Sequence, residues 1–163
     1  MAKYRWIVLV LAFGLSFAAR ATDLFWQPFD TLPPADRSLA EQALAGLFGD
    51  NPDYWPDWAE PRALLLPVAT GKGNVLVVRQ PRREPCGQFY YSVFGPPAGQ
   101  GGRAKLGDDL CAGDLQAAGV PGRPLPDLIL SEGRVRDPQT GQWRRLDQHV
   151  RWTGSKWVRL VGR

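Results

Sequence analysis

Residues 86–94 read CGQFYYSVF, and this run begins at one of only two cysteines in the chain. After the glycine and glutamine, two bulky sets of side chains alternate: Phe89, Tyr91 and Val93 in one, and Tyr90, Ser92 and Phe94 in the other. A period of two is typical of a β-strand. Because both sets are bulky, we expect both faces of this strand to be at least partly covered.

Strand signals continue on both sides of this run. The further segments that alternate or are rich in β-branched residues are ALLLPV (63–68), VLVVRQ (75–80), DLILSEGRVR (127–136), QWRRLDQHVRW (142–152) and KWVRL (156–160). Gly133 could divide its segment into two strands, and a break could occur near Asp147. The glycine-rich residues 95–115 predict a long loop, with at most a short helical turn that starts at Gly107 or Asp109.

Residues 31–50 carry the clearest helix signal. The apolar side chains that recur at helical spacing, and that we expect to lie in the core, are Leu39, Ala43, Leu44, Leu47 and Phe48. Ser38 and Glu41 match a capping box, with Asp36 or Thr31 as alternative caps one or two turns earlier. Together the signals predict an α+β fold, in which an N-terminal helix packs on a twisted antiparallel sheet of five to seven strands.

The start of the chain has the layout of a secretory signal. Lys3 and Arg5 precede an apolar run of 13 residues, and Ala19-Arg20-Ala21 then supplies a small-x-small cleavage pattern. The apolar run is shorter than the roughly 20 residues that a membrane-spanning helix needs. The sequence therefore predicts a signal peptide at residues 1–21, a single secreted domain at residues 22–163 in the periplasm or outside the cell, and no membrane span after cleavage.

Cleavage changes what the charge implies. The chain has 20 Lys and Arg and 16 Asp and Glu, and three of the basic residues lie in the predicted signal, so the mature part has a net charge of only +1. The local basic run at Arg79, Arg82 and Arg83 is interrupted by two prolines and an acidic residue, and we interpret it as a solvated strand end. Nucleic-acid binding, which needs a clustered basic face, is therefore not expected.

The two cysteines predict one disulfide, between Cys86 and Cys111. An exported chain meets an oxidising compartment, and two cysteines allow one intramolecular pairing. An intermolecular bridge or a pair of thiols are the alternatives. The spacing is far longer than the C-x-x-C of redox catalysts, so we expect the bridge to hold the long loop that follows the aromatic strand.

The reactive residue types in the sequence do not form a recognisable catalytic motif. His149 is the single histidine, and we interpret it as a solvated strand residue. The nucleophile candidates Ser92, Ser131 and Ser155 lack a G-x-S-x-G elbow. Paired carboxylates could act as in a glycosidase, with Glu60, Glu84 and Glu132 as candidates by type alone. We predict no catalytic residues and no cofactor.

Metal and phosphate sites are also not expected. Asp108, Asp109 and Asp114 fit no EF-hand register, and the glycines at 99–102 do not form a P-loop.

The segment DNPDYWPDWAEPR (50–62) is the most distinctive candidate for partner binding. It places Tyr54, Trp55 and Trp58 among acidic residues, and aromatic side chains often anchor interfaces. The alternative is an ordered loop whose aromatics cover the end of the helix.

By elimination and predicted location, the sequence favours a non-enzymatic, periplasmic binding or inhibitory protein with a protein partner in the cell envelope. An immunity-type protein that blocks a toxin or hydrolase is one concrete form. The alternatives are a small envelope enzyme that uses paired carboxylates, and a structural or assembly factor of the envelope.

Overall fold

The computed structural model describes residues 25–48, 62–68, 71, 73–83, 85–99, 102–120 and 122–161. The predicted signal peptide and the aromatic residues Tyr54, Trp55 and Trp58 lie outside the described residues.

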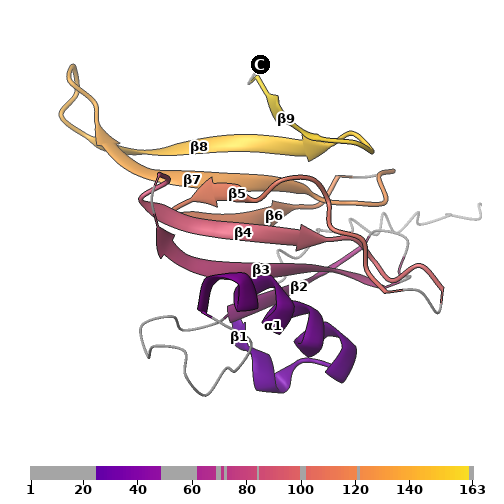
Figure 1. The fold of residues 1–163 in the computed structure, drawn as a ribbon. Coiled ribbons are helices and arrows are strands. Elements are labelled where there is room, and N and C mark those ends of the chain that lie inside the picture. Colours follow the sequence, from indigo (N-terminus) through magenta and orange to yellow (C-terminus); the bar gives the residue numbers. More distant parts are fainter. Residues whose placement is uncertain are drawn as a thin grey trace, which may run out of the picture.

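One helix and two antiparallel sheets form three layers (Figure 1). The first sheet has the order β1-β2-β3-β4-β5, and the second has the order β6-β7-β8-β9. The elements are β1 (Gln27–Pro28), the 3-10 turn η1 (Phe29–Thr31), α1 (Pro34–Phe48), β2 (Arg62–Pro67), β3 (Asn74–Arg83), β4 (Gln88–Phe94), β5 (Leu110–Ala112), β6 (Asp114–Ala118), β7 (Asp127–Arg136), β8 (Trp143–Trp152) and β9 (Trp157–Leu160). The expected combination of a helix with antiparallel strands is confirmed, although β1 and η1 precede the helix.

The first sheet is covered on both faces, as expected for CGQFYYSVF. On one face Leu64, Val77 and Tyr91 pack against Leu115, Leu128 and other residues of the second sheet. On the opposite face Ala63, Leu76, Val78 and Phe94 pack against α1 and η1. Alternate side chains of each strand therefore belong to two separate cores, which explains why both sets in β4 are bulky.

The helix begins one turn before the predicted capping box. Arg37 donates its backbone N–H to the Pro33 carbonyl at 2.9 Å, and Ser38 lies inside the helix. Pro34 suits the first helical position because its φ is already fixed and its missing N–H would have no helical partner there. Leu44 is fully buried, while Leu39, Ala43, Leu47 and Phe48 are partly buried against the same cluster, so the predicted apolar face does contact the core.

The single sheet predicted from the sequence is wrong, because the chain changes sheets at Gly113. Strand β5 ends at Ala112, strand β6 begins at Asp114, and Gly113 donates its N–H to the Ser131 carbonyl at 2.8 Å. A Cβ at Gly113 would lie only 3.2 Å from that oxygen. The described residues therefore form nine strands in two sheets, and the predicted loop at residues 95–115 contains β5 and the first two residues of β6.

The predicted disulfide between Cys86 and Cys111 is confirmed. The two Cα atoms lie 6.1 Å apart, and Cys111 in β5 pairs in register with Tyr90 in β4. The bridge therefore joins the turn just before β4 to the neighbouring strand β5.

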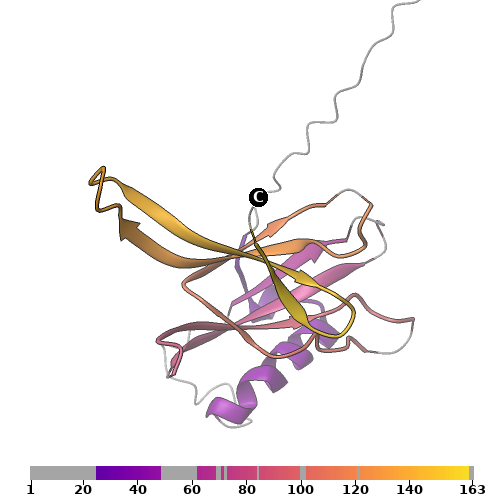
Figure 2. The same cartoon turned by 90° about the horizontal axis from the view of Figure 1, so that it is seen from above.

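The distal part of the β7–β8 hairpin extends beyond the other strands of both sheets (Figure 2). Gly133 does not divide β7, because the irregularity between Ser131 and Gly133 is a bulge inside one continuous strand. A tight turn forms its tip: Asp137 accepts backbone N–H groups from Gln139 at 2.8 Å and Thr140 at 3.0 Å.

Candidate functional site

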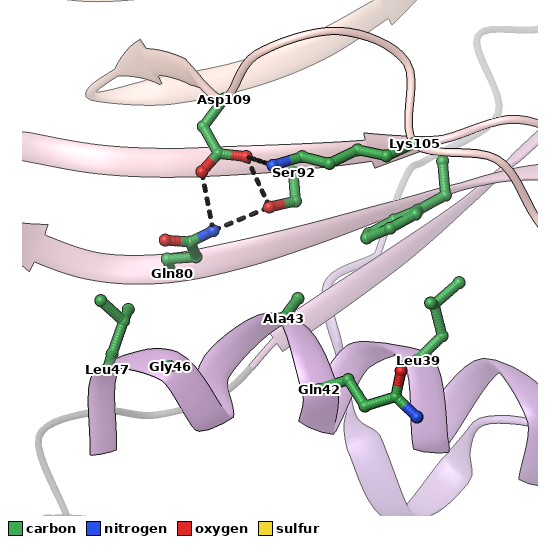
Figure 3. Close-up of a pocket in the computed structure, with 10 residues that line it drawn as sticks. Leu39, Gln42, Ala43, Gly46, Leu47, Gln80, Ser92, Lys105 and Asp109 are labelled. Atoms are coloured by element: carbon green, nitrogen blue, oxygen red, sulfur yellow. Dashed lines mark hydrogen bonds and ion pairs between the residues drawn. The ribbon is translucent and has the colours of Figure 1, made fainter. Parts of the chain in front are cut away.

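A groove runs along α1 beside the segments that follow β4. It has two parts of about 390 and 410 Å³, which share Leu39 and Gln42. The first part combines apolar side chains from α1 and β4 with a polar cluster (Figure 3). The residues of this cluster are Gln80, Ser92, Lys105 and Asp109.

The polar cluster is joined by short contacts to Asp109. Ser92 Oγ donates to Asp109 Oδ1 at 2.7 Å, and Lys105 Nζ lies 2.7 Å from the same oxygen. Gln80 Nε2 donates to Ser92 Oγ at 2.7 Å and to Asp109 Oδ2 at 3.2 Å. Both carboxylate oxygens are therefore engaged by side chains of the sheet and of the adjoining segment.

The charge state of Asp109 follows from these contacts. Burial alone would raise the pKa of Asp109, but hydrogen bonds from Lys105 and Ser92, the Lys105 charge and a hydrogen bond from Gln80 together lower it. A carboxylate with a lowered pKa is a weak general base. Asp109 is therefore a poorer proton acceptor for Ser92 than an ordinary aspartate, and the contacts of the cluster suit a structural role.

Arg103 lines the second part of the groove and connects the chain segments around it through hydrogen bonds. Its guanidinium binds Asp36 through two bonds, with Nε at 2.6 Å from Oδ1 and Nη2 at 2.8 Å from Oδ2. Nη1 also donates to the carbonyls of Gly95, at 3.0 Å, and Asn74. The Arg103 and Asp36 side chains are only 6% and 12% exposed. This arginine therefore ties the segment after β4 to the first turn of α1.

The distal β7–β8 hairpin forms the second candidate surface. Residues 134–145 contain four arginines and one aspartate, a net charge of +3. The register places Arg134 opposite Arg145, and Arg136 opposite Trp143, so these four side chains share one face. Trp143 is 67% exposed and Leu146 is 38% exposed. Positive charge and a large aromatic ring therefore project together from the body.

The acidic groups near this hairpin neutralise it only in part. Arg145 lies 3.3 Å from Asp147 and 3.8 Å from Asp114. Backbone hydrogen bonds from Thr140 and then Gln139 lower the pKa of Asp137. Arg134 and Arg144 are exposed, so the hairpin presents at least two guanidinium groups to solvent.

One edge of β8 is only partly covered. Strand β9 pairs with His149–Trp152, whereas β7 pairs along the other edge as far as Trp143. Among the described residues, therefore, no strand lies against the outer edge of 143–148.

The structure does not bring the predicted catalytic candidates together. Ser92 lies in the groove, Ser131 is buried in β7, and Ser155 and His149 are exposed in the region of β8 and β9. In the described part of the chain, no hydrogen bond joins His149 to any of these serines. Glu132 is exposed at the bulge of β7, while Glu60 and Glu84 lie outside the described residues.

The described residues contain no cluster of three His, Cys, Asp or Glu that could hold a metal ion, so Asp108, Asp109 and Asp114 do not form one. No helix within the same ranges has the length and hydropathy that a membrane crossing requires.

Two arginines of the basic run in β3, Arg79 and Arg82, lie over aromatic rings, and Arg82 is at the same time exposed near the end of the strand. The Arg79 guanidinium lies 5.5 Å from the Trp26 ring centre and 4.7 Å from that of Phe89. Arg82 lies 4.9 Å from the Phe89 ring centre. These arginines form cation–π contacts. Trp26 itself packs on the core, whereas the neighbouring Phe25 is 76% exposed.

Sequence reasoning missed the arginine-rich hairpin. The signal was present in RVRDPQTGQWRR (134–145), where arginines stand on both sides of a turn and neither strand has a continuous apolar set. Such a pattern indicates a hairpin whose two faces are both exposed to solvent, and such a hairpin does not cover a hydrophobic core.

Comparisons with known proteins gave no match: no family model, curated protein or solved structure shows significant similarity to this chain.

Proposed function

We propose that this protein is an exported, non-enzymatic binding or inhibitory protein of the cell envelope, and that the distal β7–β8 hairpin contacts its protein partner. The observation that carries this proposal is the exposure of Trp143 and several arginines on the distal part of the β7–β8 hairpin, which extends beyond the body of the molecule (Figure 2). Tryptophan and arginine are enriched among the residues that dominate binding energies. An immunity-type protein that inserts this hairpin into a toxin or hydrolase is a concrete form of the function.

The Cys86–Cys111 bridge supports the proposed location. Disulfides form and persist in oxidising compartments such as the periplasm. The N-terminal pattern of basic, apolar and small residues is that of an exported chain.

The groove beside α1 supports the alternative function, an enzyme that uses paired carboxylates, less well than the hairpin supports binding. Such an enzyme needs one carboxyl group that keeps its proton near neutral pH. In the described groove the carboxylates are Asp36, which Arg103 holds through two bonds, and Asp109, whose pKa is lowered. No observation specifically favours an assembly factor.

A capture experiment with matched variants tests the proposal. The bait is the mature chain, residues 22–163, incubated with an extract of the cell envelope. The hairpin variant carries Arg134→Glu and Arg144→Glu, and the control carries Lys156→Glu and Arg159→Glu, which make the same charge change at exposed sites near β9.

We expect wild type and control to capture the same protein, and the hairpin variant to lose it. The captured protein, once purified, should form a stoichiometric complex, and loss of its activity in the complex would establish inhibition. Equal capture by all three baits would contradict the hairpin as the contact surface. Failure of the wild type to form a complex with any purified candidate would contradict the binding function.

A further inference from the structure

The partly covered edge of β8 has the backbone chemistry of a docking site for another strand. Strand β8 is 10 residues long, but β9 is only 4 residues long and pairs at one end. In an antiparallel sheet, every second residue directs both its N–H and its C=O toward the same edge. Half of the backbone groups of 143–148 therefore face a side where the described residues place no strand. An edge of this kind is a template for β-strand addition.

The side chains along this edge select for negative charge. Arg144 and Arg145 are adjacent in β8, so their side chains point to opposite faces of the sheet. Arg134 and Arg136 of β7 extend the positive charge on the face of Arg145. A strand added along this edge would therefore have arginine beside it on both faces, and acidic residues in it would complement the hairpin's net charge.

Arginine on an edge strand can also act as protection against unwanted pairing. Protection alone does not account for Trp143 and Leu146, which expose 67% and 38% of their surface on the same segment. Large apolar groups on an open edge favour pairing, because they provide cross-strand contacts. The combination matches an edge that accepts a strand of one particular charge.

Other binding classes match these features less well. Nucleic acids and lipid surfaces do not offer a regular row of backbone N–H and C=O groups. A second copy of this chain would bring a net charge of +3 close to another +3 hairpin, which opposes association. An extended protein segment rich in Asp and Glu satisfies both the edge and the charge.

We propose that residues 143–148 of β8 bind an extended, acidic segment of the partner protein as an added antiparallel or parallel strand. This inference rests on the proposed binding function and specifies the chemistry of the partner. Trp143 and Leu146 would contact apolar side chains of that segment, while Arg144 and Arg145 would contact its carboxylates.

Synthetic peptides test the inference without knowledge of the partner. The probe is a fluorescein-labelled peptide of repeated Glu-Glu-Val-Val, about ten residues long so that it exceeds the open edge, and as a strand it carries glutamate and valine on both faces. Matched controls are a Lys-Lys-Val-Val peptide and a Glu-Glu-Val-Val peptide that is N-methylated at every residue. The last control keeps the charge but removes the N–H donors from both edges of the peptide.

Fluorescence polarisation with the mature protein should show binding of the unmodified acidic peptide and of neither control. The Arg134→Glu/Arg144→Glu variant should bind it about tenfold more weakly or worse, while the Lys156→Glu/Arg159→Glu control should bind as wild type. Hydrogen exchange should slow at the amides of 143–148 when the peptide is bound. These readouts together distinguish strand addition from general attraction between charges.

Several results would overturn the inference. The first is that the protein binds the N-methylated acidic peptide as tightly as the unmodified one. The second is that it binds none of the peptides. The third is that it binds vesicles of phosphatidylglycerol but not the acidic peptide. Self-association through the β8 edge, seen by sedimentation, would also overturn it. Hairpin-dependent capture of a partner without peptide binding would leave the proposed function standing and remove only strand addition.

Discussion

Arg103 and the arginines of the β7–β8 hairpin are placed in opposite surroundings. Arg103 is almost completely buried and donates to Asp36 and to two backbone carbonyls. Arg134 and Arg144 stand on a hairpin that extends away from both sheets, where their side chains are exposed. The same residue type therefore fastens one region internally and leaves the other accessible.

This difference separates structural charge from charge that is available for binding. A buried guanidinium with all its contacts made cannot be removed without leaving its partners unpaired. An exposed guanidinium contributes little to stability, so the arginines of a projecting hairpin are available for recognition. The comparison predicts that stability and binding respond to different sets of substitutions.

The largest expected effect is on Arg103. We expect Arg103→Ala to lower the free energy of unfolding by about 3–5 kcal/mol, because Asp36 is left as a buried charge without its partner. Arg144→Ala, the matched change on the hairpin, should stay within about 0.5 kcal/mol of wild type. Urea denaturation of both variants measures the difference. Similar changes in the free energy of unfolding for the two variants would mean that burial does not distinguish the structural arginine from the hairpin arginine.

The next effect concerns two leucines. Leu44 is fully buried under α1, and Leu44→Ala should cost about 2–5 kcal/mol because it leaves a cavity. Leu146 is on the exposed hairpin, and Leu146→Ala should change stability by no more than about 0.5 kcal/mol. Thermal and urea unfolding check both values. A cost at Leu146 equal to that at Leu44 would show that the hairpin belongs to the cooperative core.

A smaller effect is expected for Asp109, and it should depend on pH. Asp109→Asn should cost about 1–3 kcal/mol at neutral pH, because the charged hydrogen bonds from Lys105 and Ser92 are weakened. The pKa of Asp109 is lowered in the folded state. Its contribution is therefore present above the unfolded pKa of about 4 and is lost as the pH falls through the folded pKa.

Urea denaturation between neutral and acidic pH measures this linkage. The difference in stability between wild type and Asp109→Asn should shrink below about pH 4. Asp137→Asn on the exposed hairpin turn is the matched control, and we expect a smaller change. A difference for Asp109→Asn that stays constant down to acidic pH would contradict the assigned role of the carboxylate.

The smallest expected effect on stability is at Trp143. Because the ring is mostly exposed, Trp143→Ala should leave the melting temperature nearly unchanged. The same variant should weaken partner or acidic-peptide binding by about 2 kcal/mol, roughly thirtyfold, if the ring is an anchor. Calorimetry and a binding titration on one preparation give both numbers. A large drop in melting temperature with unchanged affinity would assign the ring to the fold.

The sequence predicted those parts of the fold in which local pattern and packing agree. The helix, the disulfide and the strands with long alternating or β-branched runs were all recognisable. The stretch LCAGDLQAA (110–118) was not, because small and polar residues hide its period and Gly113 interrupts it. Its strand character comes from pairing with β4 and β7, which are distant in sequence.

The candidate site was less predictable than the fold. Whether an arginine is buried or exposed depends on tertiary neighbours: Arg103 meets Asp36 across 67 positions of sequence. The accessible edge of β8 results from the short length of β9, which no motif encodes. The partner-binding role predicted for Tyr54, Trp55 and Trp58 stays a prediction.

The change of sheets at Gly113 also has a consequence for how the chain folds as it is made. Every described strand pair of the first sheet lies between residues 27 and 112, and every pair of the second lies between 114 and 160. Both cysteines belong to the earlier part. Once residue 112 has emerged, the first sheet can form and oxidise, but its face of Leu64, Val77 and Tyr91 still has no cover. Until the last 50 or so residues arrive, the nascent chain exposes an aggregation-prone surface, and this interval is where a chaperone would have most effect.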